Sequence, residues 1–333
     1  MSNTSEQPKH HWIPAVHLAR FSEDDSEKRP RDRLLWVNER ERRAPFERSA
    51  KALGYERGLY TMGDELGVDI GDPGVLDNTF NLYERRLTAT LDAVGDSQGA
   101  IDFEMWMTVL LPFIAGLTVR HPSFVDNSDA QALPQMSRWI EMSRAIAPLM
   151  AAEWQLLEAS GDTPFITSDR GFCVTHHTST GRAGMIVPIA PNLALVIFAQ
   201  SRRLLAFRQS SDRRGWLTPL PRDQRDAIFV SEVNSHVSAT ASRWVASGRR
   251  ESVVDLERGP GTTGPVLGYG WPYRGSLGAH DHAWDAALDM AEIDRKPGTW
   301  APLGIYSSMN PGVSRRDLDG GSVLTFDLDL PVD

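Results

Sequence analysis

The sequence contains a single cysteine, Cys173, among its 333 residues. One thiol cannot pair within the chain, so a disulfide framework and a zinc site built on cysteines are both excluded. Low cysteine content is typical of a reducing compartment, and we expect a cytoplasmic protein. Lysine is also scarce, because 4 of the 35 basic residues are lysines and 35 − 4 = 31 are arginines. This bias is typical of a GC-rich bacterial genome and indicates no particular chemistry.

The sequence also lacks features of secretion and of membrane insertion. The first nine residues are polar and do not form the apolar core of a signal peptide. No run of 18 apolar residues occurs, so we expect no membrane partner. The net charge of −9 argues against broad, non-specific binding to nucleic acid, which needs a positive surface. The stretch 202–225, with seven arginines and two aspartates, is a local exception that predicts a solvated basic loop.

What remains is ordinary for a globular protein, with 41% hydrophobic and 24% charged residues. No internal repeat or long low-complexity linker divides the chain, so we expect one domain over residues 1–333. Residues 1–8 and parts of the glycine-rich stretch 259–282 are predicted to be mobile, because they offer few apolar anchors.

Helical periodicity dominates the centre of the sequence. Asp72 and Pro73 form a typical helix start, and apolar residues then recur at steps of three and four from Leu76 to Val94. A nearly all-apolar helix is predicted from Asp102 to about Val119, with a kink at Pro112. Two further helices are predicted over about residues 134–159 and 221–247.

Strand patterns lie mainly in the second half of the chain. They cover residues 34–38, 165–167, 185–189, 193–198, 204–207 and 324–330. Together with the helices they predict an α+β fold, in which a helical central layer packs against a mainly antiparallel sheet. The predicted core includes Phe80, Leu87, Leu110, Ile114, Val233 and Val237.

Two polar residues interrupt the apolar stripes of predicted helices. Glu84 falls on the stripe of Phe80 and Leu87, and Asn234 falls on the stripe of Val233 and Val237. A buried carboxylate or amide costs free energy unless it is paired. Glu84 therefore forms a structural ion pair with Arg120 or Arg20, or serves as a general base or metal ligand. Asn234 either satisfies the core or orients a substrate or a catalytic group.

Other polar candidates lie in short motifs. Ser168 and Asp169 end a predicted strand, where Asp169 either caps a turn or acts as a metal ligand or proton acceptor. His11 stands just before an aromatic residue and a proline, which favours an acid/base or metal-binding role over an unstructured tail. His280 and His282 could bind a metal, but an exposed glycine-rich loop is the simpler interpretation.

Seven short segments occur in an order that resembles the DUF4238 family over about residues 10–247. They are His10–Pro14, Leu35–Val37, Gly58–Thr61, Arg120–Pro122, Phe165–Asp169, Val187–Pro191 and Asn234–Val245. Glu84 matches the helix glutamate of the family. The resemblance implies a fold and site positions, and it implies no activity. Gly171 stands where the family usually has proline, and residues 248–333 have no counterpart.

The candidate residues together favour a hydrolase. The predicted catalytic residues are His11, Glu84, Asp169 and Asn234, and the predicted substrate-binding residues are Arg120, Ser168 and Arg243. Carboxylates can hold a hard metal ion, histidine can move a proton and arginine can bind a phosphate group. We therefore expect hydrolysis of phosphoester bonds, nuclease-like and connected with defence or toxicity. A divalent metal at Glu84, Asp169 and His11 is the expected cofactor.

Two alternatives stay open. The acidic net charge favours an enzyme that acts on a small metabolite in an apolar pocket over a nuclease. A non-catalytic binding or regulatory protein would use the inward polar residues only to fix its core. No Walker A, GxSxG, HExxH or strand-associated GxGxxG motif is present, which excludes the commonest nucleotide-binding, esterase and protease classes. The hydrolase interpretation predicts that His11, Glu84, Asp169 and Asn234 surround one cleft.

Overall fold

The computed structural model describes most of the chain in segments. These are residues 7–24, 28–42, 44–61, 74–126, 134–176, 183–198, 202–209, 216–254, 256, 312–318 and 321–329. The stretch 259–282, with His280 and His282, lies outside the described residues, as do residues 1–6 and Asp72. The predictions made for them stay untested.

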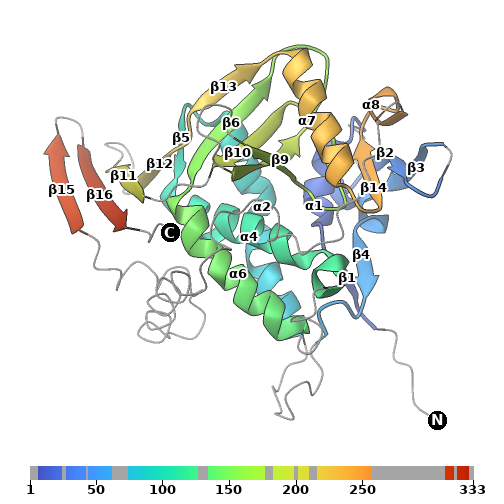
Figure 1. Cartoon of the computed structure of the whole chain (residues 1–333), viewed down its shortest axis with the longest axis horizontal. Coiled ribbons are helices and arrows are strands. Elements are labelled where there is room, and N and C mark those ends of the chain that lie inside the picture. The colour runs from blue at the N-terminus through green and yellow to red at the C-terminus, as the bar shows by residue number, and fades with distance from the viewer. Residues whose placement is uncertain are drawn as a thin grey trace, which may run out of the picture.

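A layer of helices forms the centre of the molecule (Figure 1). It consists of α2 (Val75–Asp96), α3 (Phe103–Met105), the π-helical turn η4 (Trp106–Leu110), α4 (Leu111–Arg120) and α6 (Pro134–Ala151). The predicted core residues Phe80, Leu87, Leu110 and Ile114 are all buried here. The π-helical turn ends directly before Leu111–Pro112, where proline supplies no N–H to the helix.

The central helix is apolar enough to resemble a membrane span. The 18 residues from Phe103 to Arg120 meet the length and composition of such a span, but 78% of the stretch is buried inside the protein. Burial of this extent is typical of a core helix, so the stretch gives only weak support to a membrane location.

Two sheets lie next to the helical layer. The first has the strand order β13 (Arg222–Arg225), β6 (Glu153–Ala159), β10 (Leu193–Phe198), β9 (Ala183–Ala190) and β8 (Cys173–His176). The second has the order β3 (Phe46–Ser49), β2 (Leu34–Glu39), β14 (Trp244–Ser247) and β7 (Thr167–Ser168). Neighbouring strands are antiparallel except for β13 and β6, which are parallel.

Two more sheets complete the described fold. One pairs β1 (Lys9–His11) with β4 (Tyr55–Arg57), and the other has the order β15 (Gly312–Leu318), β16 (Gly321–Asp329), β11 (Arg202–Gln209), β12 (Trp216–Pro219) and β5 (Ala100–Asp102). The shorter elements are α1 (Ala15–Leu18), η1 (Ala19–Phe21), η2 (Pro30–Asp32), η3 (Ala50–Ala52), η5 (Pro122–Asp126) and α8 (Glu251–Val254).

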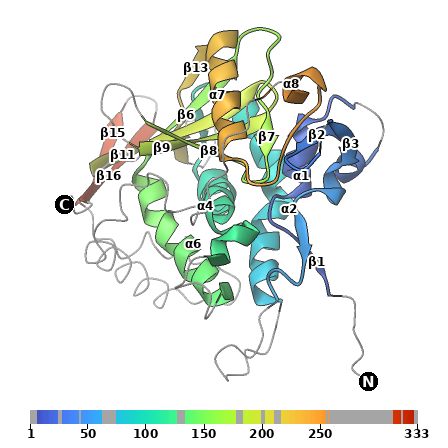
Figure 2. The ribbon, with the colours of Figure 1, turned by 45° about the vertical axis from the view of Figure 1, so that its right-hand side comes forward.

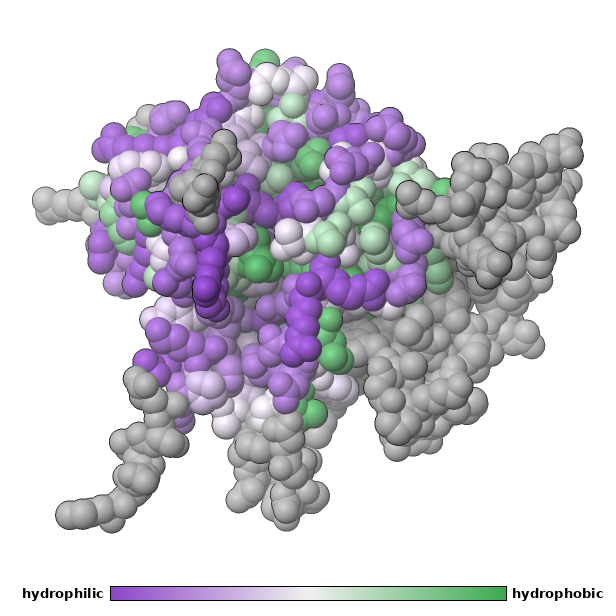
Figure 3. All heavy atoms as spheres, turned by 180° about the vertical axis from the view of Figure 1, so that it is seen from behind, coloured by the Kyte–Doolittle hydropathy of each residue, from purple (hydrophilic) through white to green (hydrophobic). Residues whose placement is uncertain are grey.

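The first sheet is covered on both faces, because successive residues of a strand point to opposite sides. On β10, Leu193, Leu195 and Ile197 belong to the main core with the helical layer, whereas Ala194 and Val196 belong to a smaller core with α7 (Ala227–Thr240). Figures 1 and 2 show α7 across this sheet from α4. The face seen in Figure 3 is mainly hydrophilic over the described residues. The α+β prediction is thus confirmed, with several antiparallel sheets.

Two predicted helices are wrong in their extent. The helix predicted over 134–159 ends at Ala151, and β6 follows between strands β10 and β13. The helix predicted over 221–247 begins only after Asp226, whose carboxylate accepts a hydrogen bond from Phe229 N, and β13 and β14 flank it. Strand pairing overrides the local helical propensity in both places. The predicted basic loop 202–225 likewise contains strands β11, β12 and β13.

Candidate functional site

The end of α4 connects two polar clusters. Arg120 is the last residue of α4, and His121 follows it before the chain turns into η5. The side chains of Arg120 and His121 are both buried but contact different groups of residues. We call these groups the Arg120 cluster, which contains His11, Tyr60, Tyr83, Glu84 and Arg120, and the Asp169 cluster, which contains His121, Ser123, Asp169, Arg170 and Ser242.

The Arg120 cluster is an ion pair between buried Arg120 and half-buried Glu84, supported by further hydrogen bonds. Arg120 Nη1 donates to the Glu84 carboxylate and to Tyr83 Oη at 3.2 Å, while Nη2 donates to the backbone oxygen of His11. Tyr60 Oη donates to the backbone oxygen of Arg120 at 3.0 Å. The structural ion pair anticipated for Glu84 is therefore present, with Arg120 as its partner.

The His11 imidazole lies at the edge of this cluster. Its Nε2 is 3.2 Å from the backbone oxygen of Lys51, which can only accept a hydrogen bond, so Nε2 carries the proton. Burial lowers the pKa of His11 below its ordinary value. His11 reaches Arg120 through its backbone oxygen, and the ring nitrogen Nε2 is directed to Lys51.

The fully buried Asp169 carboxylate accepts hydrogen bonds from two backbone amides that lie more than 70 positions later in the sequence. Oδ1 accepts from Ser242 N at 2.9 Å, and Oδ2 accepts from Arg243 N at 2.7 Å. These two amides belong to the connection between α7 and β14, which Asp169 therefore holds against the end of β7. Trp12 Nε1 also donates to the backbone oxygen of Asp169 at 2.9 Å.

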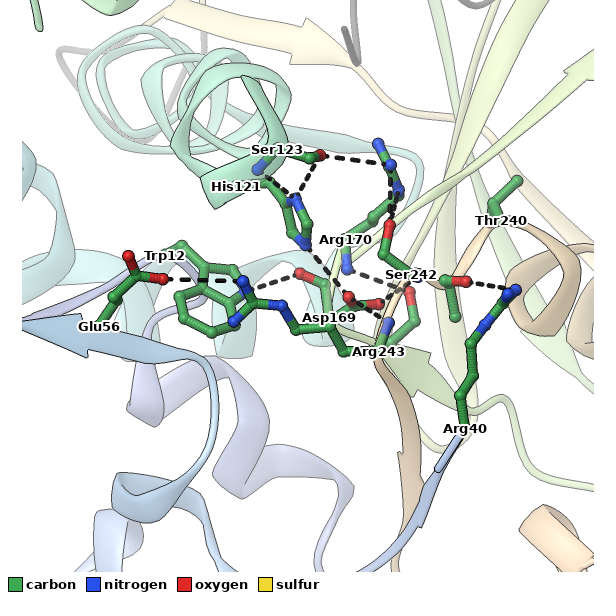
Figure 4. Close-up of polar contacts among 12 residues, drawn as sticks. Trp12, Arg40, Glu56, His121, Ser123, Asp169, Arg170, Thr240, Ser242 and Arg243 are labelled. Atoms are coloured by element: carbon green, nitrogen blue, oxygen red, sulfur yellow. Dashed lines mark hydrogen bonds and ion pairs between the residues drawn. The ribbon is translucent and has the colours of Figure 1, made fainter. Parts of the chain in front are cut away.

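His121 links Asp169 to a serine hydroxyl (Figure 4). Its Nε2 lies 3.1 Å from Asp169 Oδ2, and its Nδ1 lies 2.7 Å from Ser123 Oγ. Ser123 N donates to Nδ1 at 3.1 Å, so Nδ1 is the acceptor and Nε2 carries the proton of a neutral ring. Burial lowers the pKa of His121 although the bond to Asp169 acts in the opposite direction. The ring is therefore neutral near pH 7 and can accept a proton.

A buried arginine lies beside the same serine. Arg170 donates from Nε and Nη2 to Ser242 Oγ at 3.1 and 2.8 Å, and from Nη2 to Ser123 Oγ at 3.4 Å. Figure 4 shows Arg170, Ser242 and Ser123 gathered on one side of the His121 ring. The Ser123 side chain is half-buried. A hydroxyl, a neutral imidazole and a permanent positive charge thus meet at one point.

An aromatic and charged stack adjoins the Asp169 cluster. Arg243 places its guanidinium carbon 5.1 Å from the centre of the Trp12 ring, and its Nη2 is 3.7 Å from the Glu56 carboxylate. The Arg243 side chain is 51% exposed, so it can contact a solute from solvent. Trp12 meets the His121 ring edge-on at 5.8 Å between centroids.

Ser168 has a local structural role in the turn after β7. Its Oγ accepts from Arg170 N at 3.4 Å and its backbone oxygen accepts from Gly171 N at 3.0 Å. Gly171 has φ of +74°, and a Cβ there would lie 3.0 Å from Ile13 Cδ1. Proline could neither adopt this conformation nor donate the N–H, so the departure from the family pattern fits the turn.

The predicted site residues divide between the two clusters and a third set of contacts. His11, Glu84 and Arg120 share one cluster, and Asp169 and Arg243 meet in or beside the other. Asn234 joins neither, because its Oδ1 accepts from Ile166 N at 3.0 Å and its Nδ2 donates to the backbone oxygen of Pro164 at 2.8 Å. Its inward position is confirmed, and its partners are backbone groups before β7.

The predicted metal ligands are likewise separated. Within the described part of the chain, no group of three or more His, Cys, Asp and Glu side chains is arranged to hold a metal ion. Asp169 directs both carboxylate oxygens to N–H donors, and Glu84 faces a guanidinium. This donor set does not fit a divalent cation.

Sequence reasoning missed Ser123, Arg170 and the side-chain role of His121. His121 was visible as the middle residue of the Arg120–Pro122 motif, and Ser123 follows two positions later. A histidine and a serine this close in sequence occur by chance in many proteins. Only the contact with Asp169, 48 positions away, distinguishes this pair.

Comparison with known protein families supports the family resemblance that the order of the sequence motifs indicated. The sequence model of the DUF4238 family, described as a protein family of unknown function, matches residues 9–143 and 140–251. No curated protein and no solved structure matches the chain. Both polar clusters are built from residues inside the matched region. The chain therefore belongs to the DUF4238 family.

Proposed function

We propose that this protein is a hydrolase of phosphoester bonds, with Ser123 as nucleophile and His121 as general base. The observation that carries the proposal is one continuous chain of hydrogen bonds. Ser123 Oγ lies 2.7 Å from His121 Nδ1, and His121 Nε2 lies 3.1 Å from Asp169 Oδ2. A serine hydroxyl is a weak nucleophile until an adjacent base takes its proton, and a third group commonly orients that base.

The reaction would proceed in two displacements. Ser123 Oγ forms a bond to phosphorus while its proton moves to His121 Nδ1, and the ester oxygen leaves and takes that proton. Water then attacks the phosphoserine, loses a proton to Nδ1 and releases phosphate with return of the proton to Oγ. Asp169 acts as a positioning residue, because its carboxylate stabilises the Nε2–H side of the transient imidazolium.

The charge around Ser123 favours a phosphoester over an uncharged ester. Arg170 Nη2 lies 3.4 Å from Ser123 Oγ, where it can neutralise charge on the phosphoryl oxygens. Arg243 offers a second, partly exposed cation beside Trp12. The net charge of −9 favours a small substrate over a nucleic acid.

The proposal is tested with p-nitrophenyl phosphate and bis-p-nitrophenyl phosphate as substrates. Ser123→Ala and His121→Gln should each lower kcat by roughly 10²–10⁴-fold. Ser235→Ala is the matched control, because its exposed hydroxyl donates to Ser231 O within α7 at 3.0 Å. Activity that survives unchanged in Ser123→Ala, with normal folding, would rule out the proposed nucleophile.

A non-catalytic binding protein is the second proposal. Its support is that Asp169 connects its own segment to two others, one through His121 and one through Ser242 and Arg243, as a residue that stabilises the fold would. On this proposal Asp169→Asn lowers stability, and neither substrate is hydrolysed by the parent protein. Detectable hydrolysis that depends on His121 would exclude it.

A further inference from the structure

A second buried arginine, Arg138 on α6, has donors without partners. Its side chain is 0% exposed. Nη1 donates to the backbone oxygens of Val119 and His121, the latter at 3.1 Å. Nε and Nη2 have no hydrogen-bond partner in the part of the chain that the structure describes. Leaving two charged donors buried and unpaired is costly, which indicates that a group is missing from their side.

The two unpaired donors form one edge of the guanidinium. Nε–H and Nη2–H point in parallel and match the spacing of two oxygens of a carboxylate or phosphate. The remaining nitrogen, Nη1, already donates to the two carbonyls. The free edge of Arg138 is therefore shaped for bidentate recognition of an oxyanion.

Two further polar groups without partners lie in the same region. Gln135 Oε1 and Thr61 Oγ1 are buried and also lack hydrogen-bond partners among the described residues. Gln135 precedes Arg138 by three positions on α6, so both side chains lie on one helix face. Gln135 Nε2 donates to Leu59 O at 2.8 Å, and the Arg138 guanidinium lies 5.6 Å from the Tyr60 ring, so both residues contact the two positions that precede Thr61.

The local charge balance also favours an anion. Arg120 and Arg138 each place a guanidinium 5.6 Å from the Tyr60 ring. Glu84 is paired with Arg120, and among the described residues no carboxylate forms an ion pair with Arg138. The first turn of α6, where Gln135 lies, adds the positive end of a helix dipole.

We propose that Arg138, Gln135 and Thr61 form a binding site for an oxyanion of the phosphate class. Arg138 Nε and Nη2 bind two oxygens, Thr61 donates to a third, and Gln135 Oε1 accepts from a protonated P–OH. The acceptor distinguishes hydrogen phosphate from sulfate, which carries no proton near pH 7. These side-chain atoms are all buried, so an anion bound to them would be shielded from water.

The site would also support the turn that carries His121 and Ser123. Arg138 Nη1 holds the His121 carbonyl, so an anion that fixes the guanidinium fixes this turn as well. The inference does not depend on the proposed hydrolase, because it concerns binding and stability. Either inorganic phosphate or the phosphate group of a larger metabolite can supply the ligand chemistry.

The test is thermal unfolding and titration calorimetry with inorganic phosphate, compared with sulfate and with KCl at equal ionic strength. We expect one site and a rise in Tm of about 2–4 °C at ten times the Kd, with a smaller rise in sulfate. Arg249→Gln, which removes a half-buried arginine that pairs with Glu23, should respond like the parent. A phosphate effect no larger than that of KCl would overturn the proposal.

Gln135→Glu is the decisive variant, because it places a carboxylate beside the free edge of Arg138. We expect it to remove the response to phosphate. Thr61→Val should weaken phosphate binding by roughly 3- to 10-fold. This variant takes the place of Gln135→Glu if that protein does not fold. Phosphate binding that both variants leave unchanged contradicts the proposal. Binding should persist in Ser123→Ala, and its loss there would assign the phosphate to the proposed nucleophile instead.

Discussion

The buried side chain of His17 allows a direct test of how burial controls the protonation of a titratable group in this fold. Its side chain is fully buried between Phe21 and Phe113, with ring centroids 5.5 and 5.2 Å away. Neither ring nitrogen has a hydrogen-bond partner among the described residues. Burial, with a smaller contribution from Arg20, lowers the pKa of His17 from 6.5 to about 3. The folded state therefore keeps this ring neutral throughout the physiological range.

The consequence for stability follows from proton linkage. As the pH falls below 6.5, the unfolded chain binds a proton that the folded state does not bind, so the free energy of unfolding decreases. Between pH 7 and pH 5 this single group lowers the free energy of unfolding by roughly 2 kcal/mol. The loss stops only when the pH reaches the folded pKa of about 3.

We therefore predict that His17→Leu removes this part of the acid sensitivity. Urea unfolding of both proteins at pH 7 and pH 5 should show that the parent loses roughly 2 kcal/mol more than the variant. Any change in packing from the substitution is common to both pH values and cancels. Equal losses in parent and variant would refute the assignment of His17 as a buried neutral ring.

Two other substitutions test the core and the fate of an inward amide. Leu110→Ala removes a fully buried side chain from η4 and should lower the free energy of unfolding by roughly 2–5 kcal/mol in urea titrations; an unchanged midpoint would mean that this turn is not part of the core. Asn234→Ala leaves Ile166 N and the Pro164 carbonyl without their partner. It should lower the free energy of unfolding by about 1–3 kcal/mol for each group, measured by the same urea titration. Normal stability with lost activity would instead favour a catalytic role for Asn234.

Helical periodicity predicted the inward positions correctly. Glu84 and Asn234 interrupt apolar stripes with a period of 3.6 residues, and this period is fixed by the local geometry of each helix. Periodicity cannot name the partners. Glu84 meets Arg120, 36 positions away, and Asn234 meets Ile166, 68 positions away. Such pairings depend on how helices and strands pack against one another, and local sequence patterns do not specify that packing.

The errors in the predicted fold have the same origin. Residues 153–159 are rich in Glu, Gln, Leu and Ala, which favour a helix. They form β6 because β10 and β13 supply backbone partners on either side. The same applies to the site. The sequence motif identified Asp169 as a candidate, but the hydrogen bonds that link it through His121 to Ser123 follow from the packing of distant segments.

The most direct test of the central claim is labelling with a fluorophosphonate, followed by intact mass measurement and peptide mapping. The reagent forms a bond from an activated serine oxygen to phosphorus and releases fluoride. We expect one adduct per chain on Ser123, no adduct in Ser123→Ala, much slower labelling in His121→Gln, and normal labelling in Ser235→Ala. An adduct absent from Ser123, or one that forms equally fast without the imidazole of His121, would contradict the account.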